Sequence, residues 1–224
     1  MTITTLDGAR RIVFDIETAP HPDAPDWIGA AAVTAPRSYV DPVKIDRYVA
    51  NKRQELVDRA ALDPHCGRIV AIGWWDEATG ITTAAVAPTE DAERDLLTQW
   101  WEVAHRGVLV GYNCLKFDLP YLLTRAGYLG VLVGRSINLN PYRGSDVIDL
   151  MLKLSFNGAL ANKSLAWHIQ RRGLAVPADT ISGADVPAAV AAGEWDLVKR
   201  HVYADVKATT ALAAAMGYLP REDR

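Results

Sequence analysis

Apolar and acidic side chains alternate along one segment near the amino terminus, residues 12–18. Apolar residues take one set of alternate positions, and Asp15 and Glu17 fall in the other set. Because the side chains of a β-strand alternate between its two faces, this segment predicts a buried strand with both carboxylates on one face. Two acids on a core strand repel each other and resist desolvation, and a divalent cation such as magnesium or manganese relieves both costs. The alternative is a strand that ends in an acidic loop.

Segments with strand and helix periods follow one another downstream. Short apolar runs predict strands at residues 68–75, 81–86, 108–112 and, leading into a helix, 146–151. The first two runs are joined by a short turn and predict a hairpin. Apolar residues at helical spacing predict helices at residues 42–62, 90–105, 119–126, 164–169, 187–193 and 194–216. This order predicts an α/β fold with a mixed sheet and helices packed on it.

Residues 20–65 interrupt this alternation and predict a helical insertion between the first two strands. A proline-rich loop at residues 19–25 precedes the helix at 42–62, whose apolar residues recur every three or four positions. Insertions of this kind often lie over a functional site, and we expect the same here. No repeat, low-complexity tail or linker divides the sequence, so residues 1–224 are expected to form a single domain.

Composition and charge narrow the class of protein. Half of the residues are apolar and 23% are charged, as in soluble globular proteins. The net charge of −3 argues against a strongly basic nucleic-acid-binding protein, but it is compatible with a local basic groove beside an acidic centre. The two cysteines, Cys66 and Cys114, lack zinc-site spacing and suit a reducing cytosol. Without a signal-peptide pattern or an apolar run of membrane-spanning length, we expect a cytoplasmic protein with no membrane partner.

Asp118 is a further candidate residue, because it follows the loop 113–117 and stands at the start of a predicted helix. Its plainest interpretation is a helix N-cap. In open α/β sheets, however, sites form at strand ends near the sheet centre. Asp15, Glu17 and the loop 113–117 are all expected at such ends, so Asp118 would lie in the same region.

His201 and Asp205 are four residues apart in the last predicted helix and therefore share one of its faces. They lie at the margin of an apolar stripe formed by Val198, Val202 and Val206. One interpretation is a surface ion pair of small energetic value. The other is a third metal-site carboxylate with an ionisable ring one helical turn before it.

In order and spacing, these segments resemble the three motifs of the DEDD (DnaQ-like) 3′–5′ exonucleases, which have an RNase H-like fold. The first motif, Asp-x-Glu, corresponds to Asp15 and Glu17. The second, an aspartate after an Asn-x-x-x-Phe loop, corresponds to Asp118, and the third ends at Asp205. The resemblance covers residues 11–216. It implies an α/β, RNase H-like fold with a mixed central sheet and helices on both faces.

More narrowly, the sequence resembles stand-alone exonucleases related to the proofreading domain of family-B DNA polymerases, which are common in phages and bacteria. It departs from the family at one position. The tyrosine-type subfamily has its tyrosine four residues before the last aspartate, and the histidine-type has its histidine five before it. Here these positions hold His201 and Arg200. Tyr203 would point about 200° around the helix from Asp205 and is not expected to take the place of either.

The resemblance implies a metal-dependent 3′–5′ exonuclease that releases nucleoside 5′-monophosphates from single-stranded DNA by two-metal-ion hydrolysis. Two divalent ions, Mg2+ or Mn2+, would be held by four carboxylates, those of Asp15, Glu17, Asp118 and Asp205. His201 would act as the general base or would only position water. The residues expected to bind substrate are Thr18, Asn113 and Phe117. The basic residues considered for phosphate contacts, each with solvated surface as the alternative, are Lys116, Arg143, Lys163, Arg171 and Arg172.

Two alternative functions stay open at this point. One is an RNA 3′–5′ exonuclease, because no segment obviously reads a 2′-hydroxyl group. The other is a nucleic-acid-binding or proofreading subunit that is active only with a separate polymerase. The expected partners are the 3′ ends of single-stranded DNA or RNA and a separate DNA polymerase or replication protein. The expected setting is the cytoplasm of a bacterial or phage-infected cell.

Overall fold

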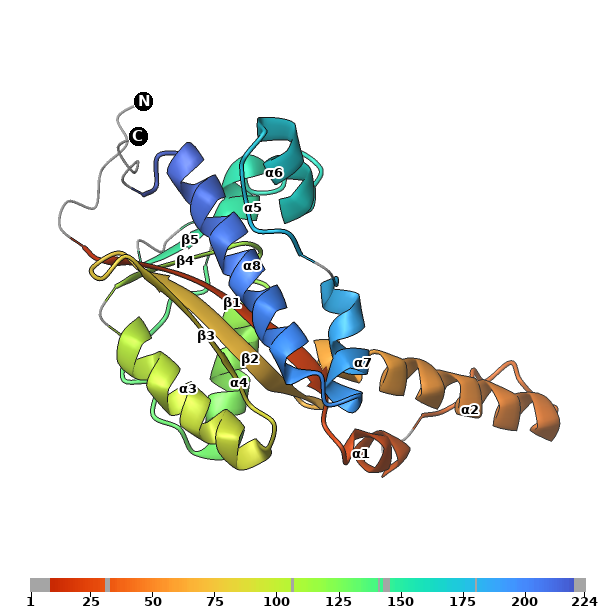
Figure 1. The fold of residues 1–224 in the computed structure, drawn as a ribbon. Coiled ribbons are helices and arrows are strands. Elements are labelled where there is room, and N and C mark those ends of the chain that lie inside the picture. The colour runs from red at the N-terminus through yellow and green to blue at the C-terminus, as the bar shows by residue number, and fades with distance from the viewer. Residues whose placement is uncertain are drawn as a thin grey trace.

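A five-stranded sheet forms the centre of the molecule (Figure 1). The computed structural model describes residues 9–30, 33–105, 107–140, 142, 146–179 and 181–219. The strands, in spatial order, are β3 (Ile81–Val86), β2 (Gly67–Asp76), β1 (Arg11–Pro20), β4 (Val108–Gly111) and β5 (Val147–Asp149). β1 pairs antiparallel with β2 and parallel with β4, β2 pairs antiparallel with β3, and β4 pairs parallel with β5. The prediction of a mixed sheet with a β2–β3 hairpin is confirmed.

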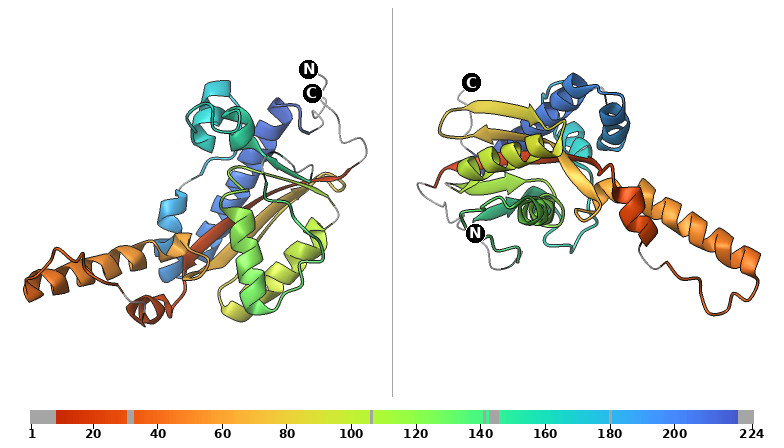
Figure 2. Two further views of the ribbon diagram at one scale, coloured as in Figure 1. Left: turned by 180° about the vertical axis from the view of Figure 1, so that it is seen from behind. Right: turned by 90° about the horizontal axis from the view of Figure 1, so that it is seen from below.

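Helices cover both faces of this sheet (Figures 1 and 2). The α-helices are α1 (Ala24–Ala30), α2 (Pro42–Asp58), α3 (Glu90–Ala104), α4 (Asp118–Leu129), α5 (Leu150–Leu154), α6 (Leu165–Arg172), α7 (Val186–Ala191) and α8 (Trp195–Ala215). Two 3-10 helices, η1 (Ala60–Leu62) and η2 (Gly183–Asp185), accompany them. Each predicted helix is present, but the one expected at 42–62 ends at Asp58 and continues after a break as η1. Within the described ranges, no helix has the length and apolar character needed to cross a membrane.

The alternation of residues along β1 divides the core into two layers. Ile12, Phe14 and Ile16 belong to a cluster with buried residues of α3 and α4, in which the Phe14 ring lies 4.9 Å from Trp100. Val13 faces the other way and packs with residues of α6 and α8. Asp15 and Glu17 follow Val13 in the same alternating set, so both carboxylates lie on the α8 side of the sheet. The face predicted for them is confirmed.

A glycine allows α8 to approach the sheet closely. Gly73 lies opposite Asp15 in the β1–β2 ladder. A Cβ atom at Gly73 would lie 2.8 Å from the Val206 side chain and 3.1 Å from that of Val202. Real Cβ atoms essentially never approach another atom to 2.8 Å, so a larger residue here would push α8 away from β2. The absent side chain therefore sets how near the residues of α8 lie to Asp15.

An ion pair buried on the opposite face connects α3, α4 and β2. Arg125 donates two hydrogen bonds of 2.8 Å to the carboxylate of Glu93, which also accepts the Ile69 N–H at 2.9 Å. Glu93 is fully buried and Arg125 is 3% exposed. A buried ion pair is tolerated when both partners are hydrogen-bonded in this way. The pair holds the helices behind the sheet in a fixed position.

The insertion does not lie over the site as we expected. α2 projects away from the sheet (Figures 1 and 2), and none of its residues, all of them described, is buried. Its apolar side chains recur at helical spacing, as predicted, but periodicity predicts an apolar face and not the surface that covers it. The prediction that a helix forms here is therefore confirmed, but the expectation that it lies over the site is wrong.

Candidate active site

The candidate active site lies where β1 extends beyond its parallel neighbour. The β1–β4 ladder ends at the pair Val13–Val110, whereas β1 continues along β2 to Pro20. A register shift between Glu17 and Thr18 marks a bulge in this extension. The edge of β1 that faces β4 therefore becomes available to other groups just where the two acids occur.

Asp118 occupies part of this space from the start of α4. The N-cap of α4 is Phe117, and Asp118 is the first helical residue, so the interpretation of Asp118 as an N-cap is wrong. Its side chain is buried and accepts hydrogen bonds from its own N–H and from the N–H of Ile16 on β1. The second bond ties the start of α4 to β1 between Asp15 and Glu17.

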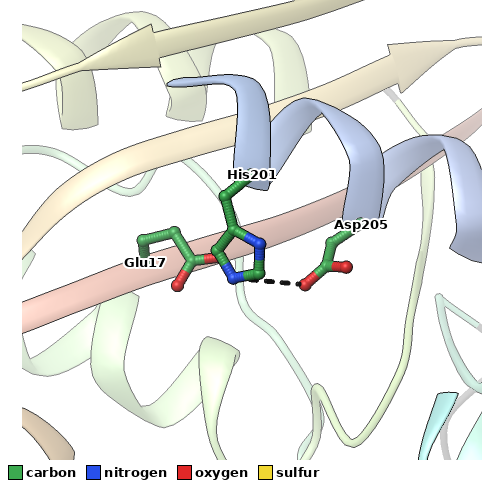
Figure 3. Close-up of side chains that lie close together, drawn as sticks. All are labelled: Glu17, His201 and Asp205. Atoms are coloured by element: carbon green, nitrogen blue, oxygen red, sulfur yellow. Dashed lines mark ion pairs between the residues drawn. The ribbon is translucent and has the colours of Figure 1, made fainter. Parts of the chain in front are cut away.

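α8 contributes His201 and Asp205 from the other side. The imidazole of His201 lies between the carboxylates of Glu17 and Asp205 (Figure 3). Its Nε2 is 3.3 Å from Glu17 Oε1 and 3.8 Å from Asp205 Oδ2. One ligand atom of each of these residues lies within 4.8 Å of the others, a spacing at which they could hold one metal ion. His201 is only 3% exposed, so the alternative of a surface ion pair is wrong.

Asp179 is part of this cluster and was missed by sequence reasoning. Its Oδ2 lies 2.6 Å from His201 Nδ1, a short hydrogen bond. Asp179 comes from the segment between α6 and η2, for which no helix or strand was predicted. His201 Nε2, on the other edge of the ring, is buried and makes no hydrogen bond with the described residues. The ring is thus held at Nδ1 while Nε2 faces the acids.

The surroundings of the acids disfavour their ionised forms and raise their pKa values. Burial, followed by the charges of Asp118, Asp205 and Glu17, raises the pKa of Asp15 well above its ordinary value. Burial and the charges of Asp205 and Asp118 do the same to the pKa of Glu17. Burial raises the pKa of Asp118 to about 7 against the effect of its two backbone hydrogen bonds. Burial also raises the pKa of Asp205, although His201 opposes this change. A cation among these groups would favour all four ionised forms.

The loop before Asp118 is held by a single carboxylate. Asp149, 2% exposed at the end of β5, accepts hydrogen bonds from the N–H groups of Asn113, Leu115, Met151 and Leu152. Two of these donors belong to the loop 113–117 and two to the first turn of α5. Asn113 adopts a left-handed conformation, with φ of 64°, at the turn out of β4. Asp149 therefore positions the loop that delivers Asp118.

The expected substrate-binding residues lie around one side of the acids. Thr18 is buried and hydrogen-bonded to Tyr121 of α4, and the ring of Phe117 lies 5.5 Å from that of Tyr121. The Tyr121 hydroxyl also donates to the Ala61 carbonyl at 3.1 Å. Thr18 and Phe117 therefore converge on one tyrosine, while Asn113 lies at the far end of the loop. Their roles toward substrate stay predictions.

Several other candidates lie on the surface. Lys116, Lys163, Arg171 and Arg172 are exposed, and Arg143 lies outside the described residues. Tyr203 is 38% exposed and lines a cavity against β3 together with Thr82 and Arg200. It therefore points away from the acids, as its position in the helix predicted.

Comparisons with known proteins found similar sequences. The family model described as DNA polymerase family B, exonuclease domain, matches residues 4–150. The DNA polymerase delta catalytic subunit of Caenorhabditis elegans is 34% identical over 79 residues, which are 34% of this chain and 7% of the relative. The corresponding subunit of Arabidopsis thaliana is 40% identical over 55 residues, 21% of this chain and 5% of the relative. The chain thus spans a small part of the length of both polymerases.

A solved structure extends the likeness over almost the whole fold. The family B DNA polymerase from the hyperthermophilic archaeon Pyrobaculum calidifontis superimposes with a TM-score of 0.63 at 20% identity. The match covers 93% of this chain and 24% of that polymerase. At this identity the likeness concerns the fold, and its coverage extends beyond the residues matched by the family model.

Proposed function

Since the chain belongs to the exonuclease-domain family of the family B DNA polymerases and is thereby a 3′–5′ exonuclease, we propose that it acts on single-stranded DNA and releases nucleoside 5′-monophosphates. One observation carries this proposal. Acids from β1, α4 and α8 converge with a buried imidazole at the one place where β1 has no parallel neighbour. The site is open to a terminal phosphodiester there, because Asp205 keeps 35% of its side chain exposed.

The donor set fits divalent metal ions. Four carboxylates lie close enough to raise each other's pKa, which is the environment that a hard cation stabilises. The residues that would hold Mg2+ or Mn2+ are Asp15, Glu17, Asp118 and Asp205. When bound, two such ions would supply a water of lowered pKa and would neutralise charge on the leaving 3′-oxygen.

We assign His201 the role of general base. Its Nε2 faces the acids without a hydrogen-bond partner among the described residues, and so it is available to accept a proton from the attacking water. Asp179 accepts the Nδ1–H and thereby leaves the lone pair on Nε2. Asp179 is then a positioning residue, because it acts through His201 and not on the substrate.

Replication or proofreading is the setting that the polymerase relatives suggest. The curated relatives named above are much longer than this chain, so any polymerase that works with it would be a separate molecule or segment. We therefore propose a DNA polymerase or another replication protein as a partner. A bacterial or phage-infected cytoplasm stays a prediction, since these relatives come from a nematode and a plant.

The test is digestion of a 5′-labelled single-stranded oligonucleotide, made as DNA and as RNA, with Mg2+, Mn2+ or EDTA. We expect a descending ladder on DNA that requires metal, with nucleoside 5′-monophosphates identified by mass. Asp15→Asn and Asp205→Asn should abolish the ladder, whereas Asp95→Asn, the same change at an exposed position of α3, should not. Faster digestion of RNA would overturn the substrate assignment. Undiminished digestion in EDTA would overturn the role of metal.

A further inference from the structure

The segment at residues 33–59, which we call the arm, is not explained by the fold or by the proposed chemistry. It comprises an extended stretch with a turn at residues 37–38 and the whole of α2, and it projects from the domain (Figures 1 and 2). None of the 17 residues of α2 is buried, and all of them are described. Val43 and Leu56 are 66% and 40% exposed. Tertiary packing normally supplies most of the stability of a helix. α2 packs against α1 and η1 but buries none of its own residues, so most of its surface is available to another molecule.

A cavity opens on the arm between the extended stretch and α2. Its volume is about 570 Å3, within the range of small-ligand sites. Tyr39 and Tyr48 form one side, with ring centroids 5.6 Å apart and an edge-to-face angle of 72°. Lys44, Arg47 and Asn51 lie on the same cavity from successive turns of α2. Two aromatic rings beside two cations and an amide match the parts of a nucleotide, a flat base and an anionic phosphate.

The charge of the arm differs in sign from that of the whole chain. The arm carries six basic and four acidic residues, a net charge of +2, although the chain carries −3. The side chains of Lys44 and Arg47 make no ion pair or hydrogen bond with the described residues, so their charges are free to meet a ligand. The one acid on the cavity, Asp41, caps α2 by accepting the Val43 N–H at 3.0 Å. The arm is therefore complementary to an anion.

Both ends of the arm are fixed beside the candidate site. β1 carries Glu17 and runs on to Pro20 and α1, and α1 packs against α2. At the other end, η1 packs against β1, and the Ala61 carbonyl accepts the hydroxyl of Tyr121, the tyrosine bonded to Thr18. The elements on either side of the arm, α1 and η1, thus adjoin the end of β1 that follows Glu17.

We propose that the arm binds the unpaired DNA strand a few nucleotides before its 3′ end, with one base against Tyr39 and Tyr48 and phosphates on Lys44 and Arg47. α2 has 17 residues and is about 25 Å long, enough to follow several nucleotides. This inference rests on the proposed function, since it assigns the arm to the substrate of the same site. It makes long strands better substrates than short ones.

The experiment measures binding and cleavage separately. Binding of 5′-fluorescein-labelled oligothymidylate of about 20 nucleotides is followed by anisotropy in the inactive Asp15→Asn background at two salt concentrations. We expect the double variant Lys44→Glu/Arg47→Glu to weaken binding about tenfold or more. The slope of log affinity against log salt concentration should become shallower by roughly 0.7 for each phosphate that the arm no longer neutralises. Tyr39→Ala/Tyr48→Ala should weaken binding about fivefold or more with an unchanged salt dependence.

The matched control is Lys153→Glu/Lys199→Glu, which makes the same charge change at exposed positions of α5 and α8. It should bind like the parent. In the active background, the arm variants should raise KM for the long strand and leave cleavage of an oligonucleotide of about four nucleotides unchanged. Equal binding of the long strand by parent and arm variants overturns the inference, as does an equal loss of affinity in the control. Failure of the parent protein to cleave either length with metal contradicts the proposed function instead.

Discussion

Replacing Asp118 by asparagine should stabilise the metal-free protein while it removes activity. In the folded protein, burial raises the pKa of Asp118 from 3.8 to about 7. Between these two pH values the folded state holds more protons than the unfolded state, so stability falls as the pH rises. Above pH 7 the carboxylate is charged in both states, and its burial then costs the full difference. Asparagine keeps an oxygen that can accept the Ile16 N–H but carries no charge.

The size of the effect follows from the change in pKa. About three pH units at 1.36 kcal/mol each correspond to about 4 kcal/mol. Asp118 shares the site with other acids, and these gain protons when Asp118 stays charged, which relieves part of the cost. We therefore expect the variant to gain about half of that free energy of unfolding, or ~2 kcal/mol. For a protein of this size, that difference raises Tm by roughly 4–8 °C.

The assay is thermal unfolding in EDTA, by circular dichroism or calorimetry, at pH 8 and at about pH 4. At pH 8 Asp118→Asn should melt above the parent, and near pH 4 the two should melt at nearly the same temperature because the carboxyl group is neutral in the folded state and only partly ionised in the unfolded state. Adding Mg2+ at pH 8 should raise the Tm of the parent more than that of the variant. Asp95→Asn, on the exposed face of α3, is the control and should change neither value. A variant that melts below the parent at pH 8 in EDTA would refute the reasoning.

Three further predictions concern residues that support the site. Asp179→Asn should lower kcat about 10- to 100-fold at unchanged KM, with partial recovery in Asp179→Glu; a change confined to KM would exclude a role through His201. Glu93→Ala leaves Arg125 buried without its partner and should cost about 3–5 kcal/mol in chemical denaturation; a cost below that of an exposed substitution would contradict it. Gly73→Ala should cost about 1–3 kcal/mol and lower activity by displacing α8. Gly127→Ala, where a Cβ meets nothing within 4 Å, should do neither.

The parts of the site that could be predicted are those that depend on local periodicity. A strand period of two determines which face of β1 bears Asp15 and Glu17, and a helical period of 3.6 determines that His201 and Asp205 share a face. The α/β pattern placed Asp15, Glu17 and Asp118 at neighbouring strand ends, whereas the arrival of His201 and Asp205 at the same place followed only from the resemblance to a family. The N-cap interpretation of Asp118 was wrong because the local sequence does not predict its contact with the Ile16 N–H, which comes from a strand about a hundred positions earlier.

The contacts of Asp179 and of the arm could not be predicted from sequence periodicity. Asp179 lies in a segment without a repeating pattern, and its conformation depends on the His201 ring that it meets across 22 positions. Asp149 escaped notice as the residue that holds the 113–117 loop because its four N–H partners come from two separate segments. The direction of α2 depends on its contacts with α1 and η1, where Val57 packs against Ala24, Ile28 and Ala60. In each case the missing information is a tertiary contact.

The distribution of the acids along the chain bears on when the protein becomes a nuclease during its own synthesis. Asp205 follows Asp15 by 190 positions, and α8, which brings it in, packs across β1, β2 and β3. At about 5–20 residues per second, a ribosome adds Asp205 roughly 10 to 40 s after Asp15. During that interval the nascent chain has Asp15 and Glu17, joined later by Asp118, but neither His201 nor Asp205. Under the proposed assignment of the site, the ability to cut a strand is therefore acquired in one late step, when α8 docks.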